Sequence, residues 1–116
     1  MRGKLIITLA LLVAGLGGAA AFTAYSRSEK LSWQEAGVVE YNWTGAVACC
    51  EALGNGARLP DIFELTGLMY RGALTNDNTD YWSRTALFGY AFGVNTRSRI
   101  LSFDRQDDID HVVCVK

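Results

Sequence analysis

Cysteine and histidine are the most reactive side chains of this sequence, and both are scarce. The chain holds three cysteines, Cys49, Cys50 and Cys114, and a single histidine, His111. This set cannot complete a four-ligand zinc site and leave groups for other chemistry, and one histidine offers few nucleophile–base pairs. We expect His111 to lie on the surface or at the end of a strand. We therefore predict no catalytic residues, no metal site and no cofactor.

The polar segment Asn76–Asp80 offers a second kind of chemistry. Its amide and carboxylate oxygens are ligands that Ca²⁺ accepts, but the segment lacks the spacing and the glycine of an EF-hand loop. We expect a solvated turn here. Its side chains Asp77, Asn78 and Asp80 are candidates for contact with a ligand.

Aromatic residues alternate along the segments that follow this turn. Because successive side chains of a strand point to opposite faces, we expect Trp82 and Phe92 inside and Tyr81 and Tyr90 nearer the surface. Exposed tyrosines beside arginines form a polar–aromatic face suited to recognition. The alternative is an aromatic core with arginines that only add solubility. The predicted ligand-binding residues are Asp77, Asn78, Asp80, Tyr81, Arg84, Tyr90, Arg97 and Arg99.

The N-terminal segment differs in composition from the rest of the chain. Residues 5–22 carry no charge, follow Arg2 and Lys4, and include small residues at 19–21. This pattern is typical of a secretory signal cleaved after Ala21, and a retained membrane anchor over residues 5–25 is the alternative. Both predict export, with the remainder in the periplasm, on the cell surface or anchored at the inner membrane. Residues 22–30 form a polar linker.

Length and charge limit the remaining possibilities. The 116 residues allow one domain, which we place at residues 31–116. The net charge is −1, and it becomes −3 when residues 1–21, which include Arg2 and Lys4, are removed. Because nucleic-acid binding needs a basic stripe, we expect no nucleic-acid partner.

Two helices are predicted in the first half of this domain. The first begins after Asn42, a plausible N-cap, and stops before Gly54. The second begins at Asp61, which forms a capping-box pattern with Glu64. The apolar face of the first helix consists of Trp43, Ala46, Val47, Cys50 and Leu53. Cys49 lies about 100° away from Cys50 around this helix.

The second half of the domain has a strand pattern. Short β-forming segments at 31–33 and 38–41 precede the helices, and four more follow them. We expect Asn95–Ser98 to be a hairpin connection and Asp104–Asp110 to be an acidic loop. The later strands are predicted at 81–85, 90–94, 99–103 and 111–115. This order of elements predicts an α+β fold.

Five short sequence words occur in order within residues 31–116. They are Leu31-Ser32-Trp33-Gln34, then Trp43 with Ala46, Cys50 and Leu53, then Arg58-Leu59-Pro60 with Glu64-Leu65, then Tyr81-Trp82-Ser83, and finally Val113-Cys114-Val115-Lys116. Together they resemble a family of exported domains named after the C-terminal domain of a bacterial collagen-like adhesin. That family is related to the C-type lectin and formylglycine-generating-enzyme folds.

The resemblance implies a C-type lectin-like fold, with two helices packed on a small antiparallel sheet. From the uncharged N-terminal residues we also expect a hydrophobic helix before it. The resemblance also implies a disulfide between Cys50 and Cys114, which agrees with a core-facing cysteine on a helix, another on the closing strand, and an oxidising compartment. Cys49 is then a free thiol. It is either a small buried residue, the site of an intermolecular disulfide or a site for thiol chemistry.

These expectations predict an exported, non-enzymatic recognition module of bacterial or phage origin that binds a glycan or a protein. The alternative is a membrane-anchored structural subunit of an envelope or pilus-like assembly. The expected partners are a glycan or protein ligand, a membrane contacted through residues 5–25, and further copies of the chain.

Overall fold

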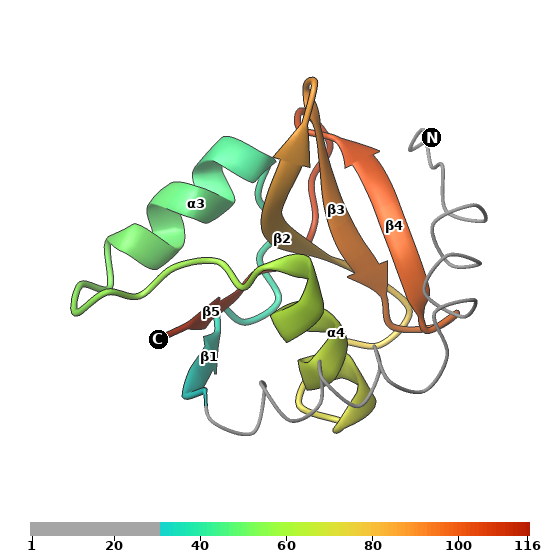
Figure 1. Cartoon of the computed structure of the whole chain (residues 1–116), viewed down its shortest axis with the longest axis horizontal. Helices are drawn as coiled ribbons and strands as arrows, with labels where there is room; N and C mark the ends of the chain where they lie inside the picture. The colour runs from blue at the N-terminus through green and yellow to red at the C-terminus, as the bar shows by residue number, and fades with distance from the viewer. Residues whose placement is uncertain (1–30) are drawn as a thin grey trace.

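The computed structural model describes residues 31–116, which form an α+β fold with two helices and two antiparallel sheets (Figure 1). The predicted signal or anchor, the linker and the N-terminal hydrophobic helix lie outside these residues. Within 31–116, no helix is long and apolar enough to cross a membrane. The elements are β1 (Trp33–Glu35), α3 (Trp43–Glu51), α4 (Ile62–Tyr70), β2 (Asp80–Leu87), β3 (Tyr90–Asn95), β4 (Ile100–Arg105) and β5 (Val113–Val115).

The larger sheet has the strand order β2-β3-β4, and the smaller one pairs β1 with β5. In the larger sheet the β2–β3 turn lies at one end and the β3–β4 turn at the other, because neighbouring strands are antiparallel. Figure 1 shows the β2–β3 turn at the top and α4 near the opposite end of the sheet. The two ends of this sheet therefore present different loops.

Local signals explain both helices. The Asn42 side chain accepts a hydrogen bond from the Gly45 N–H at the start of α3, as its N-cap position predicts. Asp61 and Glu64 form the predicted capping box at the start of α4. The first helix is shorter than expected, since it ends at Glu51. Leu53 lies beyond it and is 46% exposed, so the core position predicted for Leu53 is wrong.

The strand predictions hold for the larger sheet and are less accurate near its borders. The strands at 81–85, 90–94 and 99–103 are confirmed as β2, β3 and β4, with small changes at their ends. Asp104 belongs to β4 rather than to the acidic loop. In the described residues, segment 38–41 forms no strand and contributes only a bridge from Tyr41 to Asp110.

The core consists of two clusters on either side of the larger sheet. One packs α4 against the sheet through residues that include Leu65, Leu68 and Val94. The other packs α3 against it through Ala46 and Trp82. Both faces of the central strands are therefore covered over part of their length.

A disulfide joins α3 to β5. Cys50 and Cys114 are bonded, with their Cα atoms 5.3 Å apart, and both side chains are buried. The predicted pairing is confirmed. It connects the first helix of the domain to its last strand, so the bond closes most of the domain into one covalent loop.

Candidate binding surface

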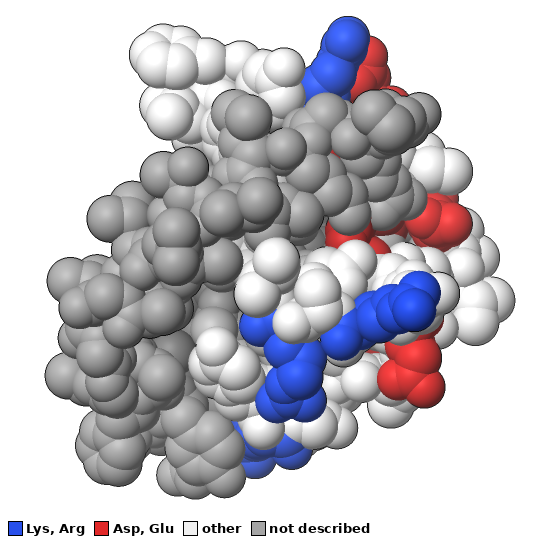
Figure 2. Space-filling view, turned by 90° about the vertical axis from the view of Figure 1, so that its right-hand side faces the viewer, with Lys and Arg blue, Asp and Glu red and all other residues white. Residues whose placement is uncertain are grey.

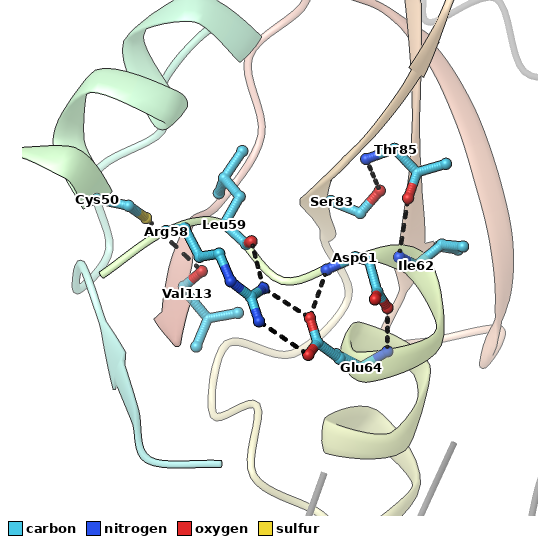
Figure 3. A network of polar contacts seen from close by, with 9 residues as sticks. All are labelled: Cys50, Arg58, Leu59, Asp61, Ile62, Glu64, Ser83, Thr85 and Val113. Carbon is cyan, nitrogen blue, oxygen red and sulfur yellow. Dashed lines mark hydrogen bonds and ion pairs between the residues drawn. The ribbon is translucent and has the colours of Figure 1, made fainter. Parts of the chain in front are cut away.

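The Arg58-Leu59-Pro60 motif and Glu64 stabilise the scaffold and do not form a binding site. The Arg58 guanidinium donates to both carboxylate oxygens of Glu64 at 2.7 and 3.0 Å, and also to the Leu59 carbonyl (Figure 3). Glu64 in turn accepts from the Asp61 N–H. The hydrogen bonds with Glu64 raise the pKa of Arg58. This network fixes the segment between α3 and α4 on the start of α4.

Trp43 and Trp82, which belong to two other motifs of the family resemblance, also connect elements of the scaffold. The Trp43 indole N–H donates to the Ser83 carbonyl at 2.9 Å, which joins α3 to β2. The indole N–H of the fully buried Trp82 donates to the Tyr41 carbonyl at 2.7 Å. The residues that carry the family resemblance thus position the elements, and candidate binding residues must be sought elsewhere on the surface.

Tyr81 is part of this scaffold, and the surface position predicted for it is wrong. Its side chain is 0% exposed within the cluster beneath α4, and its hydroxyl donates to Glu35. Asn76 donates to the same hydroxyl from its N–H and its side-chain amide. The alternation of strand side chains failed here because both faces of β2 are covered at this point, as the burial of its neighbour Trp82 shows.

Glu35 uses this network to hold the 75–79 loop. Its carboxylate accepts hydrogen bonds from the Thr75 N–H and hydroxyl as well as from Tyr81. Burial, followed by the hydrogen bond to Glu35, raises the pKa of Tyr81 well above its ordinary value of 10.0. The neutral phenol therefore stabilises the folded arrangement of β1, β2 and this loop.

Replacing Tyr81 by Phe is expected to make the free energy of unfolding decrease less steeply as the pH rises into the alkaline range. Because its pKa is raised on folding, Tyr81 stabilises the folded state fully below pH 10. Above pH 10 this contribution to the free energy of unfolding decreases by up to about 1.4 kcal/mol per pH unit. The substitution also costs roughly 1–2 kcal/mol at neutral pH through lost hydrogen bonds. Urea unfolding of both proteins at pH 8 and 10.5 measures this difference. Tyr90→Phe, on the half-exposed face of β3, is the control and should retain the wild-type alkaline slope.

The predicted solvated turn is only partly confirmed. Asp77 and Asn78 are exposed, but Asp80 is the first residue of β2 and is 0% exposed, so its predicted place in the turn is wrong. The Asn95 amide donates to the Asp80 carboxylate at 2.6 Å. Asp80 therefore lies beneath the surface and is not accessible to a large ligand.

Three buried carboxylates converge at this position. Asp80, Asp104 and Asp110 each place a carboxylate oxygen within 4.8 Å of the others. They are the residues of the described part that could hold a metal ion, because hard cations such as Ca²⁺ take oxygen ligands. Carboxylates this close can also share protons, so we assign no function to the cluster. Sequence reasoning missed Asp104 and Asp110, since only the fold brings them to Asp80.

His111 lies next to this cluster and is 9% exposed. It precedes β5, as expected of a histidine at a strand end, and its Nδ1 forms a 2.9 Å hydrogen bond with the Thr79 hydroxyl. Its ring lies 5.7 Å from that of Tyr81. These contacts give His111 a packing role between the loop and the sheet.

Two predicted binding residues, Arg97 and Arg99, lie in or next to the β3–β4 turn, where Arg99 is close to an aromatic side chain. Arg97 and Arg99 are exposed, and the Arg99 guanidinium stacks on the Tyr70 ring at 5.6 Å. Arg71, which follows Tyr70 in the sequence, stacks on the Trp33 ring at 4.9 Å. We call Trp33, Tyr70, Arg71, Arg97 and Arg99 the basic end of the molecule. Basic side chains gather in the lower half of the view in Figure 2.

The 75–79 loop borders the basic end. The Thr96 N–H donates to the Thr79 carbonyl at 2.8 Å, and the Thr96 hydroxyl donates to the Asn76 carbonyl. Asp77 and Asn78 are therefore near the β3–β4 turn, as the predicted common surface requires. Asp77 is an exposed acidic residue of this loop.

Two predicted binding residues lie apart from this surface. Arg84 is exposed in the middle of β2, where its N–H donates to the Pro60 carbonyl. Tyr90 is half-buried at the opposite end of β3 and stacks on Phe103, with ring centroids 4.9 Å apart. The structure thus places Arg84 in the middle of the sheet and Tyr90 at the end opposite the basic end.

Sequence reasoning missed three residues of the basic end. Tyr70 falls outside the apolar stripe that Ile62, Leu65, Leu68 and Met69 form on its helix, so its exposure of 38% could have been inferred from helical periodicity. Arg71 and the 41% exposed Trp33 gave no such signal. Their contact depends on the packing of α4 beside β1.

Cys49 is the free cysteine of the described residues, and it is half-buried. Its thiol lies beside the Tyr41 hydroxyl, and the hydrogen bond with Cys49 raises the pKa of Tyr41. The thiol therefore packs at the outer side of α3, away from the disulfide partner of Cys50.

Comparison with known proteins adds no identification, since no protein-family model and no curated protein sequence matches the chain.

Proposed function

We propose that this chain is an exported, non-enzymatic recognition module of bacterial or phage origin with a C-type lectin-like fold. It binds a glycan or protein ligand that carries acidic groups, and its binding surface is the basic end. The proposal of export rests on the uncharged segment at residues 5–22 that follows Arg2 and Lys4.

One observation carries the proposal of binding. Two arginine–aromatic stacks involve consecutive residues at the end of α4, since Tyr70 lies beneath Arg99 and Arg71 lies over Trp33. The stacked guanidinium of the exposed Arg99 presents N–H donors that suit a carboxylate or sulfate, and a partly exposed aromatic ring offers a flat apolar surface to a sugar or side chain. The chain is acidic overall, but this end concentrates its positive charge.

The residues of the scaffold support a binding role over catalysis. The sole histidine of the sequence is buried and hydrogen-bonded to Thr79. Cys50 and Cys114 are consumed in the disulfide. Reactive groups are therefore absent from the basic end, where arginine and aromatic side chains recognise rather than transform a ligand.

The double substitution Arg97→Ala and Arg99→Ala is expected to lower the affinity of the full chain for an acidic polymer by roughly tenfold or more. Biolayer interferometry with immobilised heparin and polyglutamate distinguishes an acidic glycan from an acidic polypeptide, and dextran is the uncharged control. Binding should weaken as salt is added.

The matched control removes the same charge elsewhere. Arg84 and Arg105 are exposed arginines outside the basic end, so Arg84→Ala with Arg105→Ala should leave binding nearly unchanged. Equal losses in both double variants would show that net charge alone drives binding. No binding of either polymer above the dextran signal would contradict the proposed function.

The second candidate function is a membrane-anchored structural subunit of an envelope or pilus-like assembly. One observation favours it, namely the hairpin residue Phe88, which is 92% exposed. A large apolar side chain in this position suits a contact between subunits.

A further inference from the structure

Arg99 adopts a backbone conformation that arginine rarely takes. Its φ angle is +59°, in the left-handed region, where the Cβ atom crowds the following carbonyl oxygen. Glycine occupies this region without that cost, and asparagine is enriched there. Of the other described non-glycine residues with positive φ, two are asparagines and the third is Phe88. The backbone of residue 99 is therefore strained, and a glycine would fit it better.

The hydrogen bonds of the β3–β4 turn hold residue 99 in this conformation. The Arg99 N–H donates to the Asn95 carbonyl at 2.8 Å and closes the turn. The Asn95 side-chain oxygen accepts from the N–H groups of Arg97 and Ser98, at 3.1 and 2.9 Å. The amide of the same asparagine donates to the buried carboxylate of Asp80. Because these bonds fix the turn on the sheet, the backbone cannot relax without losing them.

The side chain of Arg99 lies over an aromatic ring. Its guanidinium is 5.6 Å from the ring centroid of Tyr70, the last residue of α4, which is within the range of a cation–π contact. Both residues are exposed. A cation–π contact at an exposed site stabilises a protein by less than a left-handed backbone costs a residue other than glycine. The stability of the fold therefore does not explain an arginine at position 99.

We propose that Arg99 is the arginine of the basic end that binds the acidic group of the ligand, and that Tyr70 is the positioning residue of its guanidinium. This inference rests on the proposed function and assigns binding to one side chain. The guanidinium offers a planar fork of N–H donors that matches an acidic group. The Tyr70 ring and the fixed backbone restrict the directions of this fork. Binding therefore costs Arg99 less conformational entropy than it costs a side chain that moves freely.

The other two arginines of the basic end lack this combination of features. Arg97 is exposed and its φ angle is not positive. Within residues 31–116 it stacks on no aromatic ring. Arg71 does stack on Trp33, but its φ angle of −86° carries no strain that needs an explanation.

Urea unfolding tests the strain at position 99. Arg99→Gly should have a higher unfolding midpoint than Arg99→Ala, because both variants lose the side chain and only alanine keeps the Cβ atom in the left-handed region. Arg97 provides the matched control. There glycine should be no more stable than alanine, since an unstrained glycine only makes the unfolded chain more flexible. A midpoint for Arg99→Gly at or below that of Arg99→Ala would overturn the proposal.

Binding of heparin and polyglutamate to the full chain tests the role of the side chain. Arg99→Gly should weaken binding roughly tenfold although its fold is retained, whereas Arg97→Ala should weaken it only about twofold. Arg99→Lys keeps the charge and loses the planar fork, so it should recover only part of the affinity. Arg84→Ala, outside the basic end, is the control. Equal losses from Arg97→Ala and Arg99→Gly, or full recovery in Arg99→Lys, would contradict the assignment.

A third set of variants tests the positioning role of Tyr70. Tyr70→Ala should weaken binding roughly threefold, and Tyr70→Phe, which keeps the ring, should restore most of this loss. In the Arg99→Gly background, Tyr70→Ala should have little further effect, because no guanidinium remains to be positioned. The same loss in both backgrounds would show that Tyr70 does not act through Arg99.

The two proposals can fail in distinguishable ways. A wild-type chain that binds neither polymer contradicts the proposed function and, with it, the role of Arg99. A wild-type chain that binds, and that loses affinity equally when Arg97 or Arg99 is replaced, contradicts only the role of Arg99.

Discussion

Removing the disulfide with Cys50→Ala and Cys114→Ala is expected to lower the free energy of unfolding by about 4 kcal/mol. The bond spans a sequence separation of 64 residues, and closing a loop of this size restricts the unfolded chain strongly in the entropic model. Alanine is preferred to serine because both positions are buried, where an added hydroxyl would need a partner. Urea unfolding followed by tryptophan fluorescence measures the loss.

The adjacent cysteine provides the control for this prediction. Cys49→Ser leaves the disulfide intact, so its unfolding midpoint should lie close to that of the wild type. Dithiothreitol should lower the midpoint of both of these proteins and leave the double alanine variant unchanged. Identical midpoints for the oxidised and reduced wild type would show that the bond contributes nothing to stability.

Replacing Arg58 by Ala is expected to cost about 2–3 kcal/mol of stability. The substitution removes both hydrogen bonds that the guanidinium donates to Glu64, whose side chain is 6% exposed, and so takes the Arg58 charge away from a buried carboxylate. Breaking a fully buried pair costs roughly 3–5 kcal/mol, and the 34% exposure of the Arg58 side chain reduces this cost. Urea unfolding again provides the measurement.

Two further variants separate the ion pair from the capping role of Glu64. Arg58→Lys keeps the charge but loses the two-pronged geometry, so it should recover only part of the stability. Arg58→Ala with Glu64→Gln removes the buried charge and keeps an acceptor for the Asp61 N–H. This double variant should be more stable than Arg58→Ala alone, and an equal loss would contradict the role assigned to the carboxylate charge.

Much of the fold could be predicted because its signals are local. Asn42 and the Asp61–Glu64 pair each mark a helix start through contacts within one helical turn. The three strands of the larger sheet follow from alternation and from the hairpin connection at 95–98. The helix that was expected to reach Leu53 ends earlier, since periodicity alone does not include the packing that determines where a helix stops.

The binding surface was less predictable, as Tyr81 and Asp80 show. Both were expected near the surface from local polarity and alternation, and both are fully buried. Their burial depends on Glu35 and Asn95, which lie elsewhere in the sequence and reach them only in the folded chain. Alternation assumes that one face of a strand is solvated, and this assumption fails where helices and loops cover both faces of a sheet.

The α+β order of elements and the helix caps could be predicted from the sequence alone, because these features depend on neighbours a few residues apart. Which aromatic rings are buried, and the contacts of Arg99 with Tyr70 and of Arg71 with Trp33, follow only from the folded chain. The same is true of the convergence of Asp80, Asp104 and Asp110. The physical reason is that such contacts depend on strand register and on how helices pack across the sheet, which no local energy term specifies.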